Sequence, residues 1–208
     1  ADARRDDLAA FAALDGRIGR WSWGGGLRAD RVSSRNRGGY FGDCDSVHGA
    51  VSGFLAGGVN VWSDLALTLQ MARGFRDATL SDRYYRGVTG RGFATGNPDL
   101  QPETSLQLDG SAVWTSGPLR LAAYGYWYRI RDLIERYKSG NDYFFRNRGE
   151  ATIRGAEIEG QVAVTDTLRL EVGAQYLRGE TDDTGEQTDD VPPPGVFVTL
   201  RRTPGRSW

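Results

Sequence analysis

Apolar and polar residues alternate with a period of two through most of this 208-residue chain. Successive side chains of a β-strand point to opposite faces, so the alternation predicts strands with one apolar and one polar face. The clearest apolar sets are Leu65, Leu67, Leu69 and Met71; Leu106, Leu108, Ala112 and Trp114; Ala156, Ile158, Val162 and Val164; and Leu168, Leu170, Val172, Ala174 and Tyr176. The pattern favours an all-β fold.

The connections between the expected strands alternate in length. About nine strands are expected, centred near residues 10, 24, 52, 68, 110, 126, 155, 173 and 197. Tight turns are expected at Asp15-Gly16, Val59-Asn60, Ser116-Gly117-Pro118, Asp166-Thr167 and Pro204-Gly205, and longer loops at 33–46, 77–104, 137–142 and 181–190. Short turns at one rim and long loops at the other are typical of outer-membrane barrels. We expect one curved antiparallel sheet with no helix beyond a turn or two. A large soluble all-β domain with one wet face is the alternative.

The alternation also predicts which face each side chain takes. Leucines and a valine should face lipid, namely Leu65, Leu67, Leu69, Leu168, Leu170 and Val172. Charged residues should face the concave side, namely Glu157, Glu159, Arg169 and Glu171. The segment 119–134 is ambiguous, because both faces carry aromatic residues. We assign Tyr124, Tyr126 and Tyr128 to lipid, since the opposite face ends in Arg129 and Arg131.

Composition excludes several classes of function. The chain has 26 Lys and Arg against 27 Asp and Glu, so it lacks the excess positive charge of a nucleic-acid binder. One Cys and one His exclude an intrachain disulfide, a multi-cysteine metal site and a two-histidine metal motif. No run of 18 apolar residues occurs, and residues 1–14 do not form a signal peptide. We predict no catalytic residue, no metal site and no cofactor.

Two sequence boxes resemble the paired signature of TonB-dependent outer-membrane receptors. The first lies in Arg73–Tyr85, with Phe75-Arg76-Asp77-Ala78 where the family often has Phe-Arg-Ala-Pro. The second, Gly96-Asn-Pro-Asp-Leu-Gln-Pro-Glu-Thr104, is similar to the family's Asn-Pro-x-Leu-x-Pro-Glu box. The segments 128–134 and 145–159 also resemble the family's C-terminal barrel strands. The resemblance extends from about Gly49 to Arg202.

The resemblance implies a 22-stranded transmembrane barrel with an N-terminal plug that contacts TonB. Residues 1–208 would then be a partial C-terminal barrel segment, with the plug and the remaining strands outside the chain. Its place would be the outer membrane of a Gram-negative bacterium, in contact with the lipid bilayer and lipopolysaccharide. The implied function is active uptake of a scarce ligand, for which we favour a ferric siderophore. Cobalamin, a glycan and a passive porin-like barrel remain alternatives.

The loop 77–104 holds the expected ligand contacts. Arg83, Tyr84, Arg86 and Arg91 suit an anionic or catecholate iron chelate, because guanidinium groups pair with charge and the ring stacks on flat groups. Alternatively, the tyrosines belong to an interfacial girdle and the arginines face lipopolysaccharide phosphates. Residues 79–96 contain no His, and haem receptors of the family commonly carry one between the boxes. The box residues are expected to be structural first, namely Phe75, Arg76, Asn97, Pro98, Leu100, Pro102 and Glu103.

Two other clusters have weaker functional meaning. Cys44 and His48 could form a nucleophile pair, but a surface loop whose Cys pairs with a segment outside this chain is favoured. Five acidic residues could bind calcium, but their irregular spacing favours a solvated loop; they are Asp182, Asp183, Glu186, Asp189 and Asp190.

Overall fold

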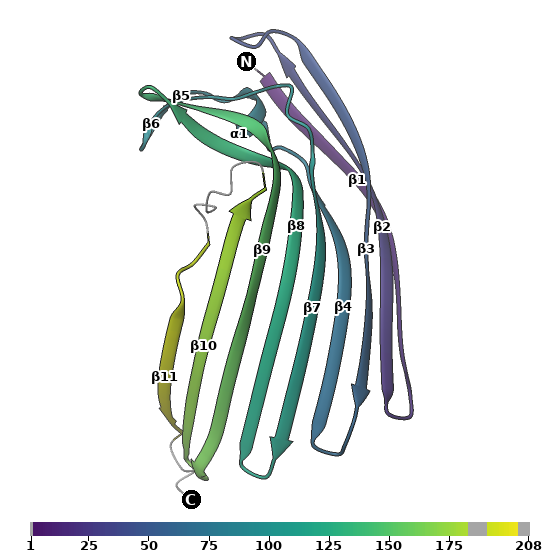
Figure 1. Ribbon diagram of the computed structural model, residues 1–208. Helices are drawn as coiled ribbons and strands as arrows, with labels where there is room; N and C mark the ends of the chain where they lie inside the picture. Colours follow the sequence, from purple (N-terminus) through teal and green to yellow (C-terminus); the bar gives the residue numbers. More distant parts are fainter. Residues whose placement is uncertain (1, 183–190, 204–208) are drawn as a thin grey trace, which may run out of the picture.

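Nine long strands form one curved sheet in the computed structural model, which describes residues 2–182 and 191–203 (Figure 1). Each strand pairs antiparallel with its neighbours, in the order β1-β2-β3-β4-β7-β8-β9-β10-β11. The strands are β1 (Asp2–Ile18), β2 (Trp21–Arg37), β3 (Cys44–Asn60), β4 (Leu65–Arg76), β7 (Glu103–Ser116), β8 (Leu119–Ser139), β9 (Asp142–Thr165), β10 (Leu168–Thr181) and β11 (Gly195–Arg202). The predicted all-β sheet is confirmed.

Three short elements lie between β4 and β7. They are α1 (Leu80–Tyr84), β5 (Arg86–Thr89) and β6 (Gly92–Thr95). The helix begins at a capping box, in which Thr79 and Asp82 each accept a hydrogen bond from the other's backbone N–H. Strand β6 pairs with β5 and runs parallel to the start of β9, with Phe93 opposite Asp142. Among the described residues no helix is long or apolar enough to cross a bilayer.

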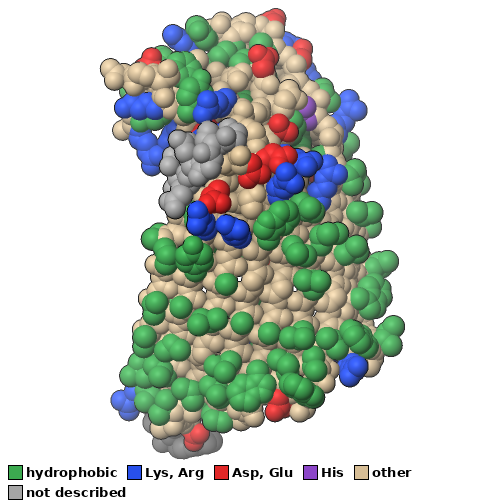
Figure 2. Space-filling model, in the orientation of Figure 1, with side chains coloured by type: hydrophobic (Ala, Val, Ile, Leu, Met, Phe, Trp, Pro, Cys, Tyr) green, Lys and Arg blue, Asp and Glu red, His purple; other side chains and the backbone are tan. Residues whose placement is uncertain are grey.

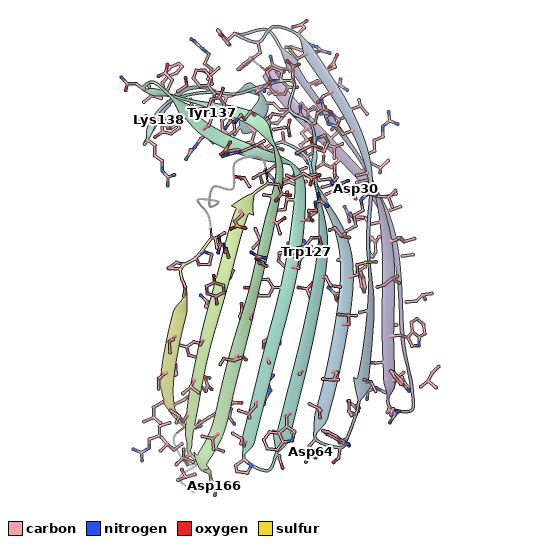
Figure 3. All side chains as sticks on the ribbon, in the orientation of Figure 1. Asp30, Asp64, Trp127, Tyr137, Lys138 and Asp166 are labelled. Carbon is pink, nitrogen blue, oxygen red and sulfur yellow. The ribbon has the colours of Figure 1, made fainter. Side chains whose placement is uncertain are left out.

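Short turns and long connections lie at opposite rims, as predicted. Asp64 and Asp166 mark the rim of short turns, and Tyr137 and Lys138 mark the other (Figure 3). The segment 77–102 lies at the rim of Tyr137 and Lys138 (Figure 1). The expected turn at Pro204-Gly205 and most of the loop 181–190 fall outside the described residues.

Several expected strand boundaries were wrong. Strand β1 continues through Asp15-Gly16, because Asp15 stays in register with Gly24, and the turn is at Gly19-Arg20, where Gly19 has φ +58°. At the opposite rim, β2 extends to Arg37 and β8 to Ser139, so the loops expected at 33–46 and 137–142 shorten to 38–43 and 140–141. Backbone pairing continues there beyond the residues that alternate between apolar and polar, because backbone hydrogen bonds do not depend on the side chains.

The outer face of the sheet is apolar and exposed. Directly paired residues of neighbouring strands share a face. Leu67 is paired with Val59 and Ala112, and Ile158 with Ala123 and Ala174. Leu69 and Ile158 expose 59% and 60% of their surface. Figure 2 shows hydrophobic side chains spread over this part of the sheet. Such a surface suits lipid as its surroundings.

The inner face is the one over which the 77–102 segment folds, and it is polar. Glu157 and Glu159 alternate with the outward Ile158, and Gln161 donates to Glu171 across the strands. The predicted faces of the leucines and of these glutamates are therefore confirmed.

The assignment of Tyr124, Tyr126 and Tyr128 to lipid was wrong. Tyr124 pairs directly with Glu157, which places the three tyrosines on the inner face. The Tyr126 hydroxyl donates to Glu157 at 3.3 Å, and the Tyr128 hydroxyl donates to Asp109 at 2.8 Å. The phenol groups satisfy carboxylates of the neighbouring strands, a contact that alternation along one strand does not reveal.

Candidate functional site

The two sequence boxes meet where β4 ends and β7 begins. Arg76 and Glu103 are directly paired, and the Arg76 guanidinium binds the Glu103 carboxylate with two hydrogen bonds of 2.6 and 2.9 Å. The backbone N–H of Ile134 on β8 also donates to Glu103. Bidentate pairs fix geometry as well as charge. Half-buried Phe75 precedes Arg76 and pairs with Thr104, and Pro102 directly precedes β7. The pair ties three strands together beneath the 77–102 segment.

A buried ion pair holds α1 against the inner face. Arg83, whose side chain is 1% exposed, donates to Asp77 at 2.8 Å and to the carbonyl oxygen of Pro98 at 2.8 Å. His48 of β3 places Nδ1 3.0 Å from the same Asp77 oxygen and 3.3 Å from an Arg83 nitrogen. Because a buried charge needs a partner, Asp77 and Arg83 depend on each other.

The second box clamps the 77–102 segment to β9. The Asn97 side chain donates to the Phe145 carbonyl, and Asn97 Oδ1 accepts from the backbone of Asp99. Leu100 is fully buried. The side chain of Asn147 on β9 exchanges two hydrogen bonds with the backbone of Gln101. These contacts support the structural role expected for Asn97, Pro98 and Leu100.

The stem of the β5–β6 hairpin is closed at a glycine. The backbone N–H of Gly96 donates to the Tyr85 carbonyl, and that of Asn97 donates to the Asp82 carbonyl. A Cβ at Gly96 would lie 2.6 Å from the backbone carbonyl of Arg83. The two chain segments approach this closely because Gly has no side chain.

The four proposed ligand-contact residues fall into two groups. Arg83 and Tyr84 are buried beneath the hairpin, whereas Arg86 and Arg91 are exposed on it. The Arg86 guanidinium lies 4.1 Å from the Tyr40 ring and 5.1 Å from the Phe93 ring. The aromatic rings attract the cation and hold it in place. Only Arg86 and Arg91 of the four present their charge to solvent.

Tyr84 lies in an apolar contact of α1. Its ring meets Phe41 edge to face at 6.3 Å, and its buried hydroxyl lies near Ser46. Burial raises the pKa of the Tyr84 phenol above its ordinary value. The burial of Arg83 and Tyr84 argues against direct contact with a ligand and for a role in holding the hairpin.

Sequence reasoning gave Tyr40 and Phe41 no role, and it did not predict that His48 and Asp77 would meet in this region. Asp77 had one signal, because it stands where the family often has Ala. The Cys44–His48 pair is not formed in the structure: Cys44 is a free thiol that donates to the Phe41 carbonyl, while His48 faces Asp77. Of the five acidic residues considered for calcium, only Asp182 lies within the described part, where no group of three or more potential ligands gathers.

A hollow also lies on the inner wall of the sheet. It has a volume of about 610 Å³, and Tyr124, Tyr126, Tyr128, Asp109 and Glu157 contribute to its lining. The rings of Tyr126 and Tyr128 stack with centroids 5.4 Å apart. The lining of this hollow therefore combines phenol rings with the carboxylates of Asp109 and Glu157.

Comparison with known proteins assigns the chain to a family. The model of the TonB dependent receptor-like β-barrel matches residues 1–201, and the chain belongs to this family of outer-membrane β-barrel transporters and receptors. The vitamin B12 transporter BtuB of Photobacterium profundum is 28% identical over 182 residues, which cover 85% of this chain and 27% of BtuB.

Solved structures show the same fold. The copper transporter OprC superposes with a TM-score of 0.85 at 22% identity, covering 98% of this chain and 33% of OprC. The ferric yersiniabactin uptake receptor FyuA from Yersinia pestis superposes with a TM-score of 0.72 at 20% identity, covering 95% of this chain and 31% of FyuA. The chain therefore spans about a quarter to a third of these relatives.

Proposed function

We propose that this chain is part of the barrel wall of an outer-membrane receptor for TonB-dependent uptake. The parent protein would supply the plug, which contacts TonB, and the remaining strands of a 22-stranded barrel. The length of the relatives supports this proposal. So do the two ends of the sheet: β1 pairs only with β2 and β11 only with β10 within the described residues, and an unpaired edge is costly in lipid.

The proposed cargo is a ferric siderophore-like chelate with anionic or catecholate groups. The observation that carries this proposal is the Arg86 guanidinium, held at the outer rim between the rings of Tyr40 and Phe93. Arg91 adds a second exposed cation on the same hairpin. A fixed guanidinium can pair with a charged chelate, and the neighbouring rings can stack on flat groups. Arg83 and Tyr84 would hold the hairpin from beneath.

Binding of ferric chelates to the intact receptor tests the cargo. Replacing Arg86 and Arg91 together by Ala should weaken the binding of the right chelate at least tenfold, because each charged contact contributes about 1–3 kcal/mol. A matched control replaces Arg169 and Arg201 by Ala; these two residues are paired at the opposite rim. The control removes the same amount of positive charge. Unchanged affinity for every chelate in the panel would reject the proposed contacts.

Cobalamin is the second candidate, and the likeness to BtuB favours it. Cobalamin needs polar and aromatic contacts without excess Arg, so the double Arg86/Arg91 variant should keep its affinity for cobalamin. A glycan would behave similarly and belongs in the same panel. Uptake that persists in cells lacking TonB would instead indicate a passive, porin-like barrel.

A further inference from the structure

A small four-stranded sheet stands at the rim that carries the long connections. Strands β5 and β6 pair as a hairpin, β6 runs parallel to the start of β9, and the start of β9 pairs with the end of β8. The strand order in this part is therefore β5-β6-β9-β8. We call it the rim sheet; Tyr137 and Lys138 mark its β8 side in Figure 3.

One face of the rim sheet carries a row of aromatic rings with an arginine toward each end. Paired residues share a face, and so do residues two apart in a strand. The pairs Thr95–Phe144 and Phe144–Tyr137 define this face across β6, β9 and β8. Its aromatic and basic members are Arg86, Phe93, Phe144, Tyr137 and Arg146, here called the aromatic face.

Contacts within the aromatic face hold its β8–β9 end in place. The ring centroids of Tyr137 and Phe144 are 5.9 Å apart. The Arg146 guanidinium lies 4.4 Å from the Tyr137 ring and donates to the Glu135 carboxylate at 3.0 Å. Aromatic side chains have few rotatable bonds, so a flat molecule can stack on them at a low cost in side-chain entropy.

The end of the aromatic face on the β5–β6 hairpin is open to solvent and carries a free charge. The Arg86 guanidinium lies 5.1 Å from the Phe93 ring and has no ion pair among the described residues. Val88, on the same face and paired with Phe93, is 78% exposed, whereas Ala94 on the opposite face is 3% exposed. The aromatic face is therefore the side of the hairpin that a dissolved molecule can reach.

We propose that the aromatic face makes the receptor select ferric chelates with aromatic donor groups, such as catechols, over aliphatic chelates of the same charge. Flat donor rings can stack on the rings of this face, while Arg86 attracts the negative charge of the donor groups. An aliphatic chelate gains only the interaction with the charge. Neighbouring strands are about 4.8 Å apart, so the face extends over about 14 Å from β5 to β8 and can contact more than one ring of a chelate. The inference rests on the proposed function and narrows its cargo class.

Two ferric complexes of equal net charge test the selection on the intact receptor. One is the complex of a tricatechol, and the other is that of an aliphatic tris-hydroxycarboxylate. The wild type should bind the tricatechol complex about tenfold more tightly, because ring stacking adds to the attraction between charges. The double variant Tyr137→Leu with Phe144→Leu should lose most of this preference and keep its affinity for the aliphatic complex. The retained affinity shows that the variant is folded.

The matched control removes one Tyr and one Phe from the opposite face of β9, by Tyr143→Leu with Phe145→Leu. This control should keep the wild-type preference, and an equal loss of preference in it would overturn the selection. Equal affinity of the wild type for the two complexes would also overturn it, but would leave an anionic chelate as the cargo. Binding of neither complex would reject both the selection and the proposed cargo. If the Tyr137/Phe144 variant loses affinity for both complexes equally, the rings stabilise the rim sheet and do not select the chelate.

Discussion

The membrane wall and the head of this sheet are stabilised by opposite means. The head comprises the 77–102 segment with the ends of β2 and β3, and it contains the largest fully buried side chains of the described residues: Arg83, Leu100, Asn36 and Ser34. Three of these four are polar. In the wall, by contrast, leucines are exposed and the strands are joined by backbone pairing.

The contrast follows from the surroundings of each region. Lipid takes the place of a protein core around the wall, so the wall needs an apolar outside and a complete backbone ladder. The head stands outside the apolar band and must fix a loop of 26 residues in place, 77–102. It does so with directional hydrogen bonds and with ion pairs, of which Arg83–Asp77 is buried. Substitutions should therefore act differently in the two regions: the head should be destabilised by the loss of a charge, and the wall by the addition of one.

The largest expected effect is in the head. Replacing Arg83 by Met leaves Asp77 as a buried charge without its guanidinium partner, which should destabilise the head by about 3–5 kcal/mol. Hydrogen exchange of the amides in 78–100 of the intact receptor would measure the loss. Met in place of exposed Arg91 is the control and should change little. If these amides exchange as slowly in the Arg83 variant as in the wild type, the ion pair does not stabilise the head.

The wall should be most sensitive to charge on its outer face. Leu67→Arg places a cation toward lipid and should cost about 2–4 kcal/mol near the bilayer midplane. Unfolding of the receptor from lipid vesicles in urea measures this cost, and Leu170→Arg should behave similarly. The neighbouring substitution Thr68→Arg points to the inner face and should cost much less. Equal costs for Leu67 and Thr68 would contradict the assigned faces.

Close packing of the backbone should also stabilise the head, with a smaller effect than the buried ion pair. Gly96→Ala forces the stem apart, because its Cβ would lie 2.6 Å from the Arg83 carbonyl, and should cost about 1–3 kcal/mol. Gly90→Ala in the same hairpin meets no atom within 4 Å and is the matched control. Cleavage of the 77–102 segment by added protease should rise only for Gly96→Ala. Equal cleavage of the two variants would show that the stem tolerates a side chain.

The smallest effect concerns the buried phenol of Tyr84. Because burial raises its pKa in the folded head, this group favours the folded state below its ordinary pKa of about 10, and the contribution is lost as pH rises through the higher folded value. Tyr84→Phe should change stability by less than about 1 kcal/mol at pH 7, since it removes one neutral hydroxyl and keeps the packed ring. Protease cleavage of the head between pH 8 and 11 should increase more in the wild type than in Tyr84→Phe.

Periodicity predicted the wall better than the head. Alternation identified the sheet and the outward leucines, since each face of a strand repeats every second residue. It did not show which face of β8 meets lipid, because Tyr126 and Tyr128 are apolar rings whose hydroxyl groups reach Glu157 and Asp109 on other strands. The burial of Arg83 could not be predicted from the sequence either. Its partners Asp77, His48 and Pro98 come together only after β3 and β4 pair.

The closed stem of the hairpin has a consequence for the evolution of such receptors. Residues 86–95 extend from the head between Tyr85 and Gly96, and the backbone N–H of Gly96 donates a hydrogen bond to the Tyr85 carbonyl. The anchoring contacts of Asn97, Gln101 and Glu103 lie after this junction, and that of Arg76 lies before it. Insertions or exchanges within 86–95 should therefore leave these anchoring contacts and the pairing of β4 with β7 unchanged. If the hairpin contacts the ligand as proposed above, ligand specificity could change through this short segment alone.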